Sequence, residues 1–457
     1  MVFSSIIFLY FFLPLCLLLY FLVPGIRAKN VILLLFSLLF YGWGEPVYIL
    51  LMLLNITVNY FLGRLMEWEP DKKKRTLVFA VFFNLLVLGF FKYYGFLIES
   101  INGLLGTSLP VRKLPLPIGI SFYTFQTLSY IIDLYRGKFK AQRSLIRFGL
   151  YISMYFQLIA GPIVRYHDVE KQLSQREISA RRLGKGLAMF LFGLGKKVLI
   201  ANLVGELFDI LVSGQTQFST LGAWIGAIAY TLQIYFDFSG YSDMAVGLGH
   251  AFGFDFPENF RTPYLSSSVT EFWRRWHISL GTWFREYVYI PLGGNRGGAA
   301  KHIRNILIVW ALTGLWHGAN WTFVLWGLYY AVFLLIEKYV VKKRVPVLGN
   351  IVTLLIVVVG WVLFSSNDLA EVGVRLSAMA GFGALGLTDT AALFYLREYA
   401  VWLILGIVLC LPFAARLKTG LLWKHRVLTG LIALLILVIS TAFLVTQNYN
   451  PFLYFRF

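Results

Sequence analysis

The sequence predicts an all-α polytopic membrane protein, a bundle of about ten to thirteen transmembrane and re-entrant helices. Three observations predict this class. The chain of 457 residues is 58% hydrophobic and only 14% charged, whereas a soluble domain has roughly 25% charged residues. Apolar runs long enough to cross a bilayer recur along the chain. The net charge of +19 comes from short basic segments between these runs, which is typical of cytoplasmic membrane loops.

The same distribution of charge argues against nucleic-acid binding, because the cations are not gathered on one soluble domain. Cys16 and Cys410 lie in separate apolar runs and supply neither a disulfide framework nor the spacing of metal ligands. We therefore expect no metal site. The first cation is Arg27, so the first 23 residues lack the basic start of a cleaved signal peptide. They are predicted to be a transmembrane helix with an extracytoplasmic N-terminus.

The positive-inside rule, which assigns basic loops to the cytoplasm, gives a path of the chain through the membrane. The predicted spans are 4–23, 31–43, 46–64, 76–97, 117–135, 187–211, 222–245, a bent or broken hairpin at 305–337, and then 351–365, 399–415 and 427–446. The stretch 149–163 is too short to cross and ends in Ala160-Gly161-Pro162, so we expect a re-entrant segment. With no internal repeat and no long linker, residues 1–457 are predicted to form one membrane domain.

Basic runs mark the cytoplasmic ends of this path, and acids mark an outer loop. The basic residues used are Lys72-Lys73-Lys74-Arg75, Lys342-Lys343-Arg344, and Arg416, Lys418, Lys424 and Arg426 of the inner loop 416–426. The proposed outer loop 366–398 contains Asp368, Glu371, Asp389 and Glu398 against Arg375 and Arg397. The asymmetry supports the orientation.

Two predicted spans carry polar residues at helical spacing. The residues are Tyr123, Gln126, Tyr130 and Asp133 in 117–135, and Tyr230, Gln233, Asp237 and Tyr241 in 222–245. Each set falls on one helical face. Since a charge at the bilayer centre costs at least roughly 2.5–3.5 kcal/mol, these faces line a polar chamber or hydrogen-bond to neighbouring helices. For the two sets together, the chamber is favoured.

A single histidine, His317, lies in the apolar hairpin 305–337. A lone histidine on an apolar helix is more often a satisfied core group, but its cost within a membrane favours a function. Thr313 and Asn320 share its helical face, and either could fix the imidazole tautomer. Gly314 and Gly318 form a small-xxx-small pair that allows close approach of a helix or a substrate. The expected walls of the site are Trp310, Trp316 and Trp321.

The segment 262–304 is predicted to stay at the cytoplasmic surface. Ser268-Val269-Thr270-Glu271 has the pattern of a capping box. An apolar stripe follows, which predicts one interfacial helix; its residues are Trp273, His277, Leu280, Phe284 and Tyr287. The glycine-rich basic loop 293–298 could hold phosphates, although it matches no P-loop or dinucleotide fingerprint. Nothing in the sequence supports a hydrolase or a metalloenzyme.

These stretches resemble the membrane-bound O-acyltransferases (the MBOAT family), and within them the bacterial alginate O-acetylation branch. The motifs that carry the resemblance are Glu271-Phe272-Trp273-Arg274-Arg275-Trp276-His277-Ile278-Ser279-Leu280, Gly293-Gly294-Asn295-Arg296-Gly297-Gly298, Leu315-Trp316-His317-Gly318-Ala319-Asn320, Pro117-Ile118-Gly119-Ile120-Ser121-Phe122, and Tyr235-Phe236-Asp237-Phe238-Ser239-Gly240-Tyr241-Ser242-Asp243-Met244. The resemblance covers most of the chain and weakens after residue 340. It implies a ring of helices around a thin centre, with funnels from both faces that meet near His317.

The resemblance also implies a reaction, with His317 as the principal catalytic residue and His277 as the second, both in 262–337. Acetyl groups would come from a cytoplasmic donor, acetyl-CoA, and cross the plasma (inner) membrane of a bacterium. An extracytoplasmic SGNH-like acetyltransferase would be the partner and an exopolysaccharide the acceptor, with membrane lipids around the chain and no bound cofactor. The candidate substrate-binding residues are Trp316, Asn320, Trp273, Arg274, Arg285, Arg296, Lys301, Gln126, Gln233 and Asp237.

Three other functions stay open at this stage. One is D-alanyl transfer from a carrier protein to teichoic acid. The second is a transporter that moves a lipid or glycan without chemistry, for which inverted repeats would be expected and none is found. The third is a scaffold that anchors the extracytoplasmic enzyme.

Overall fold

The structure is a computed structural model that describes residues 1–112, 114–159, 161–341, 346–412, 425–447, 449–451 and 453. Every regular element in these ranges is helical. Some residues used above lie outside the described ranges, namely Ala160, Lys342-Lys343-Arg344, Arg416, Lys418 and Lys424. The described residues form two compact units, 1–190 with 244–257 and 191–243 with 258–457. The single domain over 1–457 stays a prediction.

The described helices make this a multi-pass membrane protein. Seven are long and apolar enough to cross a bilayer, namely Gly25–Gly44, Tyr48–Trp68, Pro70–Leu105, Ala180–Leu211, Trp321–Tyr339, Pro346–Ser365 and Arg426–Thr446. The helices Thr390–Glu398 and Ala400–Leu409, bent by 60° at their junction, would together be an eighth span. The predicted first span is a shorter apolar helix, Phe8–Leu22.

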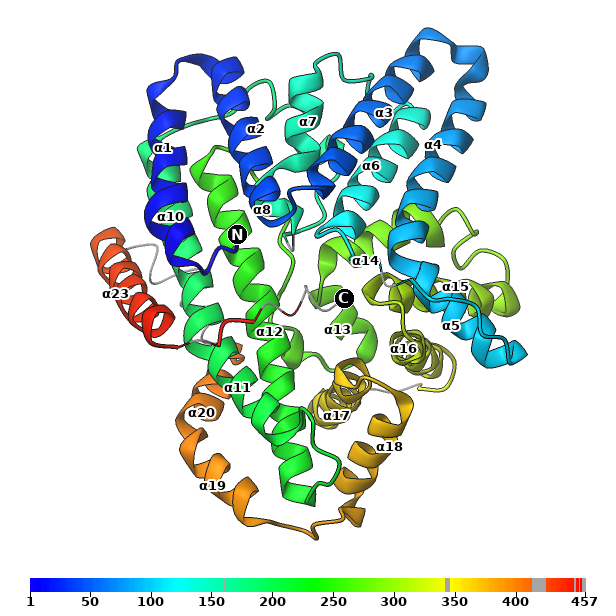
Figure 1. The fold of residues 1–457 in the computed structure, drawn as a ribbon, viewed down its shortest axis with the longest axis vertical. Coiled ribbons are helices and arrows are strands. Elements are labelled where there is room, and N and C mark those ends of the chain that lie inside the picture. Colours follow the sequence, from blue (N-terminus) through cyan, green and yellow to red (C-terminus); the bar gives the residue numbers. More distant parts are fainter. Residues whose placement is uncertain are drawn as a thin grey trace. The chain divides into compact units, whose positions relative to one another are not determined.

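The first unit contains the helices of the first half of the chain. They are α1 (Leu13–Leu22), α2 (Gly25–Gly44), α3 (Tyr48–Trp68), α4 (Lys73–Leu88), α5 (Tyr94–Leu105), α6 (Ile120–Tyr135), α7 (Leu145–Ser153), α8 (Tyr155–Leu158), α9 (Tyr166–Val169) and the first part of α10 (Ala180–Gly195). Figure 1 shows α3, α4 and α6 running side by side. Buried amides join them: the Asn84 side chain bonds to Asn55 and Asn59, and Thr127 donates to Asn55. Such bonds between polar side chains hold apolar helices together in a bilayer.

The predicted re-entrant segment has the broken backbone expected of it. α7 ends at Ser153, Met154 is non-helical, and the single turn of α8 follows. The described residues of 148–159 are all buried, so protein covers the break. Gly119, with φ +75°, lies against this turn, and a β-carbon on it would stand 2.9 Å from the Leu158 carbonyl oxygen. This close approach explains why glycine occupies position 119.

The second unit holds the motifs of the predicted site. Its helices are the end of α10, α11 (Asn202–Leu211), most of α12 (Thr220–Ala251), α13 (Val269–Arg275), α14 (Ile278–Phe284), α15 (Ala299–His317), α16 (Trp321–Tyr339), α17 (Pro346–Ser365), α18 (Leu369–Ser377), α19 (Thr390–Glu398), α20 (Ala400–Leu409) and α23 (Arg426–Thr446). π-helical turns at Lys196–Ala201, Arg285–Tyr289 and Ala378–Phe382 join some of them.

The broken hairpin predicted at 305–337 is confirmed. α15 and α16 pack against each other, and residues 318–320 form the break. Glycines set the closeness of the two helices. A β-carbon on Gly314 would stand 2.2 Å from the Phe323 carbonyl oxygen, and one on Gly327 would stand 2.1 Å from the Trp310 carbonyl oxygen. The predicted close approach at Gly314 is therefore made by α16.

The prediction of one interfacial helix through 268–287 is wrong. α13 ends at Arg275, Trp276 is extended, His277 is left-handed with φ 44° and ψ 53°, and α14 begins at Ile278. The apolar spacing continues across this break, so periodicity alone could not reveal it. α13 packs on α16 and α17 rather than lying apart on a surface.

The outer loop predicted at 366–398 contains α18 and α19. Two of its acids begin these helices: the Asp368 side chain accepts from Glu371 N, and that of Asp389 accepts from Ala392 N. Arg375 is only 2% exposed, and its guanidinium donates to the hydroxyls of Ser365 and Ser366. This arginine therefore ties α18 to the end of α17.

Candidate functional site

His317 is the last residue of α15, at the break of the hairpin. Its side chain is buried, with a residue exposure of 6%. Aromatic rings surround the imidazole, with centroids at 4.9 Å for Trp316, 5.1 Å for Trp326 and 5.2 Å for Phe364. The rings come from α15, α16 and the end of α17, so three helices fix the surroundings of the imidazole.

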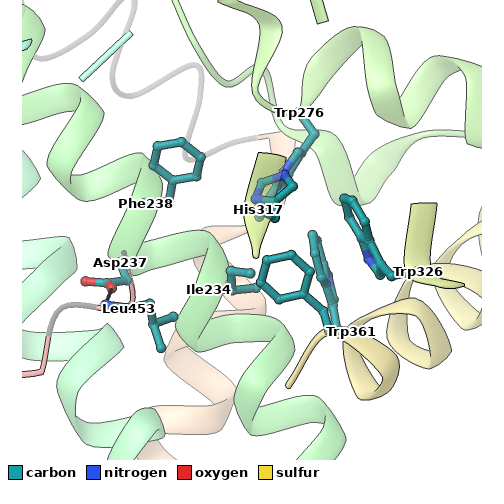
Figure 2. Close-up of a pocket in the computed structure, with 9 residues that line it drawn as sticks. Ile234, Asp237, Phe238, Trp276, His317, Trp326, Trp361 and Leu453 are labelled. Carbon is teal, nitrogen blue, oxygen red and sulfur yellow. Dashed lines mark hydrogen bonds between the residues drawn. The ribbon is translucent and has the colours of Figure 1, made fainter. Parts of the chain in front are cut away.

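His317 lines a small cavity in the second unit, shown in Figure 2. The other lining residues are Ile234, Asp237, Phe238, Trp276, Trp326, Trp361, Phe364 and Leu453. The cavity measures about 10 Å³, which is space for roughly one water molecule. Figure 2 shows Asp237 and Leu453 at one side, Trp326 at the other, and His317 between them. The site is therefore a mostly apolar space with one imidazole and one carboxylate.

His277 lies close to this cavity. Its ring centroid is 6.4 Å from that of His317, 5.8 Å from that of Trp316 and 4.6 Å from that of Phe238. The side chain is 1% exposed, and neither ring nitrogen has a hydrogen-bond partner within the described part of the chain. Burial lowers the pKa of His277 to about 3, so the ring is neutral near pH 7.

Asp237 is the one predicted α12 residue that lines the cavity, and its charge is compensated. Lys197 Nζ lies 2.9 Å from one carboxylate oxygen, and Leu453 N donates to the other at 3.0 Å. Lys197 also donates to Asn202 and to the Pro451 carbonyl oxygen. Both side chains of the ion pair are almost fully buried. The pair thus secures the chain end that brings Leu453 to the cavity.

The other predicted polar positions do not line the cavity. Gln233 packs against α11, where a β-carbon on Gly205 would stand 2.3 Å from its amide nitrogen. Tyr230, on the same face of α12, packs against Phe208 of α11. Of the polar face predicted on α12, Tyr230 and Gln233 thus meet α11, whereas Asp237 reaches the cavity. Gln126 is buried on α6 of the first unit, where its backbone carbonyl accepts from Ser129 and Tyr151.

The polar residues expected to orient His317 have other partners. The Thr313 hydroxyl donates to the Val309 carbonyl oxygen within α15. Asn320 caps α16 by accepting from Thr322 N, and its amide donates to the Asn367 carbonyl oxygen. The prediction that one of them fixes the tautomer of His317 has no support in these contacts. Asn320 instead shapes the break after His317, because it starts the second helix of the hairpin.

The tryptophans predicted around the site fall in three different places. Trp316 adjoins both histidines. Trp273 and Trp310 pack edge to face at 4.7 Å in the contact of α13 with the hairpin, and neither lines the cavity. Trp321 is 53% exposed, so its prediction as a wall of the site is wrong. An exposed tryptophan at a helix end is typical of a membrane–water interface.

The four predicted phosphate-binding cations are all exposed, namely Arg274, Arg285, Arg296 and Lys301. Arg296 belongs to the glycine-rich loop that leads into α15, and Lys301 lies in the first turn of that helix. The loop is held by the Asn305 amide, which donates to the carbonyl oxygens of Leu292 and Gly294. Exposed cations beside a helix N-terminus suit an anionic group.

Two carboxylates hold the start of α13. The Ser268 hydroxyl accepts from Glu271 N, which confirms one half of the predicted capping box. Glu271 accepts from Ser267 rather than from Ser268. Partial burial raises the pKa of Glu271, but bonds from Ser267 and Arg275 outweigh it and leave the pKa below its usual value. Glu337 of α16 accepts from the backbone of Val269 and Thr270, a cap that the sequence did not suggest.

Sequence reasoning missed most of the cavity wall. Trp326 and Trp361 stack in its lining with centroids 6.1 Å apart, and Trp276 packs on Trp361 at 4.9 Å. An aromatic residue in an apolar span is ordinary, so these positions carried no signal. Leu453 was missed because nothing local marks where a chain end packs. No group of three or more His, Cys, Asp or Glu within the described ranges could hold a metal ion.

These features define a multi-pass helical membrane protein with one buried histidine, His317, in the lining of a largely apolar cavity and a second, His277, whose ring lies 6.4 Å from the first. Residues 140–347 match the model of the membrane-bound O-acyltransferase family. The chain is 41% identical to a probable alginate O-acetylase of Pseudomonas putida over the full length of both chains. It is 45% identical to one of Pseudomonas syringae pv. tomato, over 85% of this chain and 77% of that relative.

A peptidoglycan O-acetyltransferase of Helicobacter pylori is 33% identical, over 85% of this chain and 81% of the relative. The chain belongs to the membrane-bound O-acyltransferase family. Its resemblance to the alginate O-acetylation branch is confirmed by the relatives at 41% and 45% identity. It is an O-acyltransferase.

Proposed function

We propose that the chain takes acetyl groups from cytoplasmic acetyl-CoA and passes them across a bacterial inner membrane for O-acetylation of an extracytoplasmic polysaccharide. The observation that carries this proposal is His317, an imidazole at the break of the α15–α16 hairpin that lines a small, largely apolar cavity. The relatives named for alginate and for peptidoglycan O-acetylation support acetyl as the acyl group and a cell-surface polymer as its destination.

His317 has two chemical routes to the transfer. As a general base it would take the proton of an acceptor hydroxyl, a role worth about 10²–10⁴ in rate. As a nucleophile it would attack the thioester carbon, carry the acetyl group and release the CoA thiolate. A small, largely apolar cavity supports both routes, because it admits little water to the reactive carbonyl. Trapping of acetylated His317 after a single turnover distinguishes the second route from the first.

His277 acts beside His317 in the proposed reaction. Their ring centroids are 6.4 Å apart, and neither nitrogen of His277 has a hydrogen-bond partner among the described residues, so no direct hydrogen bond joins the two rings. A bound group between the two rings would meet both. With a lowered pKa, the His277 ring is neutral and offers one N–H donor and one acceptor nitrogen. It can therefore orient the donor carbonyl or the acceptor hydroxyl.

The donor would bind on the cytoplasmic side. The phosphates of CoA would bind to cationic side chains. Four exposed cations are candidates, namely Arg274, Arg285, Arg296 and Lys301. Two of the four adjoin the N-terminus of α15, the helix that carries His317 at its other end. A nineteen-residue helix of this kind is about 28 Å long, close to the thickness of the hydrocarbon core. Donor phosphates and His317 would thus lie near opposite ends of α15.

The cavity must widen for the reaction, since an acetyl group is larger than the roughly one water molecule that fits.

The extracytoplasmic part of the proposal is an SGNH-like acetyltransferase as the partner, with the N-terminus of this chain outside. The basic segments between spans support this orientation of the N-terminus, because cations are enriched in cytoplasmic loops.

The test is turnover of radiolabelled acetyl-CoA by purified protein, with and without the candidate partner and polysaccharide. We expect label in the polymer with the wild type and a loss of about 10²–10⁴-fold with His317→Ala. His250→Ala is the matched control, because His250 pairs with Asp255 in the first unit and not with the cavity. Full polymer acetylation by His317→Ala that inserts normally contradicts the proposal. Turnover only with a D-aminoacyl carrier protein would show a different donor.

A further inference from the structure

We propose that Asn259 is a positioning residue that holds His277 in the backbone conformation from which its ring lies beside that of His317. The inference rests on the proposed function and adds a residue that no sequence motif marks as catalytic. It starts from an unusual backbone. Among the non-glycine residues that the structure describes, only Thr262 and His277 have positive φ, and His277 is at φ 44° and ψ 53°.

A side chain with a β-carbon adopts the left-handed region at a cost, and persists there only when its surroundings impose it. His277 occupies the position before α14, where a side-chain oxygen normally accepts from the first helical N–H groups. An imidazole at this site makes no such bond. The turn at His277 therefore needs an external partner to satisfy the start of α14.

Asn259 is that partner, and it uses both of its oxygens. Its backbone carbonyl accepts from Ile278 N at 3.0 Å. Its side-chain oxygen accepts from Ser279 N at 3.1 Å and from the Ser279 hydroxyl at 2.9 Å. Asn259 is 2% exposed, so these bonds form away from water. Asn259 thus satisfies the first two N–H groups of α14 in place of His277.

A second contact holds the other side of the turn. Arg261 N donates to the Arg275 carbonyl oxygen at 2.9 Å, at the last residue of α13. Between them, Phe260 packs its ring on Trp276 at 5.0 Å and on Phe238 at 4.8 Å. The segment 259–261 therefore clamps the chain on both sides of Trp276 and His277. Trp276 and His277 thus form the non-helical connection between α13 and α14.

The ring of His277 depends on this backbone for its place. Neither of its nitrogens has a hydrogen-bond partner among the described residues, and its nearest ring is Phe238 at 4.6 Å. Within the described ranges, no polar side chain would hold the ring beside that of His317 if the turn relaxed to negative φ. The clamp from Asn259 is thus what keeps His277 6.4 Å from His317.

The test compares steady-state acetyl transfer by variants of the full-length protein. Asn259→Ala removes the side-chain acceptor, and we expect kcat to fall about 10²-fold, with the KM for acetyl-CoA changed less than about threefold. Ser279→Ala removes one of the two bonds to that acceptor and should cost about tenfold or less in kcat. Asn259→Asp keeps an acceptor oxygen and should recover most of the loss.

Two controls separate positioning from general damage. Asn350→Ala removes a hydrogen bond made by a different asparagine, whose part-buried amide donates to the Leu265 carbonyl oxygen at 2.7 Å, and should lower the melting temperature without lowering kcat. Glycine adopts the left-handed region freely, so His277→Gly removes both the ring and the need for the clamp. In that background we expect Asn259→Ala to cost less than about threefold.

An equal loss from Asn259→Ala in both backgrounds, or full kcat in Asn259→Ala and Ser279→Ala, overturns the positioning role. His317→Ala is the reference for the proposed function itself. If wild-type transfer persists in His317→Ala, the proposed function fails. If His317 is required and the Asn259 series is silent, only the positioning inference fails.

Discussion

The imidazoles of His277 and His317 lie 6.4 Å apart although they come from separate elements, a left-handed turn between α13 and α14 and the C-terminal end of α15. Neither element alone brings the two imidazoles together. The turn is held by hydrogen bonds with residues 259–261, and the helix end is held by the glycine contacts of the α15–α16 hairpin. Substitutions in segment 259–261 or at the hairpin glycines should therefore affect the site.

The pKa of His277 predicts a pH dependence of stability. The pKa is about 3 in the folded chain and about 6.5 when unfolded. Above pH 6.5 both states are neutral and nothing is lost. As the pH falls from 6.5 towards 3, His277 is protonated in the unfolded chain but stays neutral in the folded chain. The free energy of unfolding therefore falls by up to about 1.4 kcal/mol per pH unit. Between pH 6.5 and 5, the loss is roughly 2 kcal/mol.

The measurement is the melting temperature in detergent, followed by tryptophan fluorescence at pH 7.5 and pH 5.0. Wild type should lose more on acidification than His277→Asn, which cannot titrate. Equal losses in the two proteins would mean that His277 is protonated normally in the folded chain. Any fall of activity near pH 6 should also persist in His277→Asn, because a group that is neutral above pH 3 cannot produce it.

Gly314→Ala tests the closeness of the hairpin. The added methyl group would stand 2.2 Å from the Phe323 carbonyl oxygen, so α15 and α16 must separate. We expect a loss of about 1–3 kcal/mol in stability and reduced transfer, because His317 is carried on α15. Gly430→Ala is the control, since nothing lies within 4 Å of its β-carbon position and an alanine there should be neutral or slightly stabilising. Equal melting temperatures for the two variants would contradict the packing argument.

Asp237→Asn tests the buried ion pair beside the cavity. The substitution leaves the Lys197 ammonium buried without its counter-charge, which costs about 3–5 kcal/mol. The exposed pair of Lys72 and Glu69 is the comparison, and Glu69→Gln should cost at most about 1 kcal/mol. Thermal unfolding of the two variants gives the contrast. A small effect of Asp237→Asn would show that water reaches the pair.

Glu337→Gln tests the cap on α13. The carboxylate accepts from Val269 N and from the backbone and hydroxyl of Thr270, at the positive end of that helix. Loss of its charge should cost about 1–2 kcal/mol and lower transfer through the displaced α13–α14 turn. Lys338→Gln changes an exposed neighbour on the same turn and should stay within about 0.5 kcal/mol of wild type. Limited proteolysis near residue 269 reads out the loosened helix start.

Local features of the sequence predicted much of the fold. Apolar length and charge placement located most of the spans, and Ala160-Gly161-Pro162 with its short apolar run located the break after α7. Helical periodicity placed Asp237 and Gln233 on one face of α12, which is correct for the helix. Periodicity could not say that Gln233 meets α11 while Asp237 reaches the cavity, because the neighbours of a helical face depend on residues far away in the chain.

The sequence by itself determined the class of protein, the helical hairpin and the two histidines, because composition, span length and motif are properties of neighbouring residues. Only the tertiary structure decided how the histidines meet. In the tertiary structure α13 ends before His277, although the apolar spacing of the sequence continues. Hydrogen bonds to the Asn259 carbonyl oxygen and from Arg261 N stabilise this break. The tertiary structure also brought Leu453 and Trp361 to the cavity of His317. Contacts between residues far apart in the chain depend on complementary shape and hydrogen bonding in the packed structure, so the pattern of neighbouring residues does not predict them.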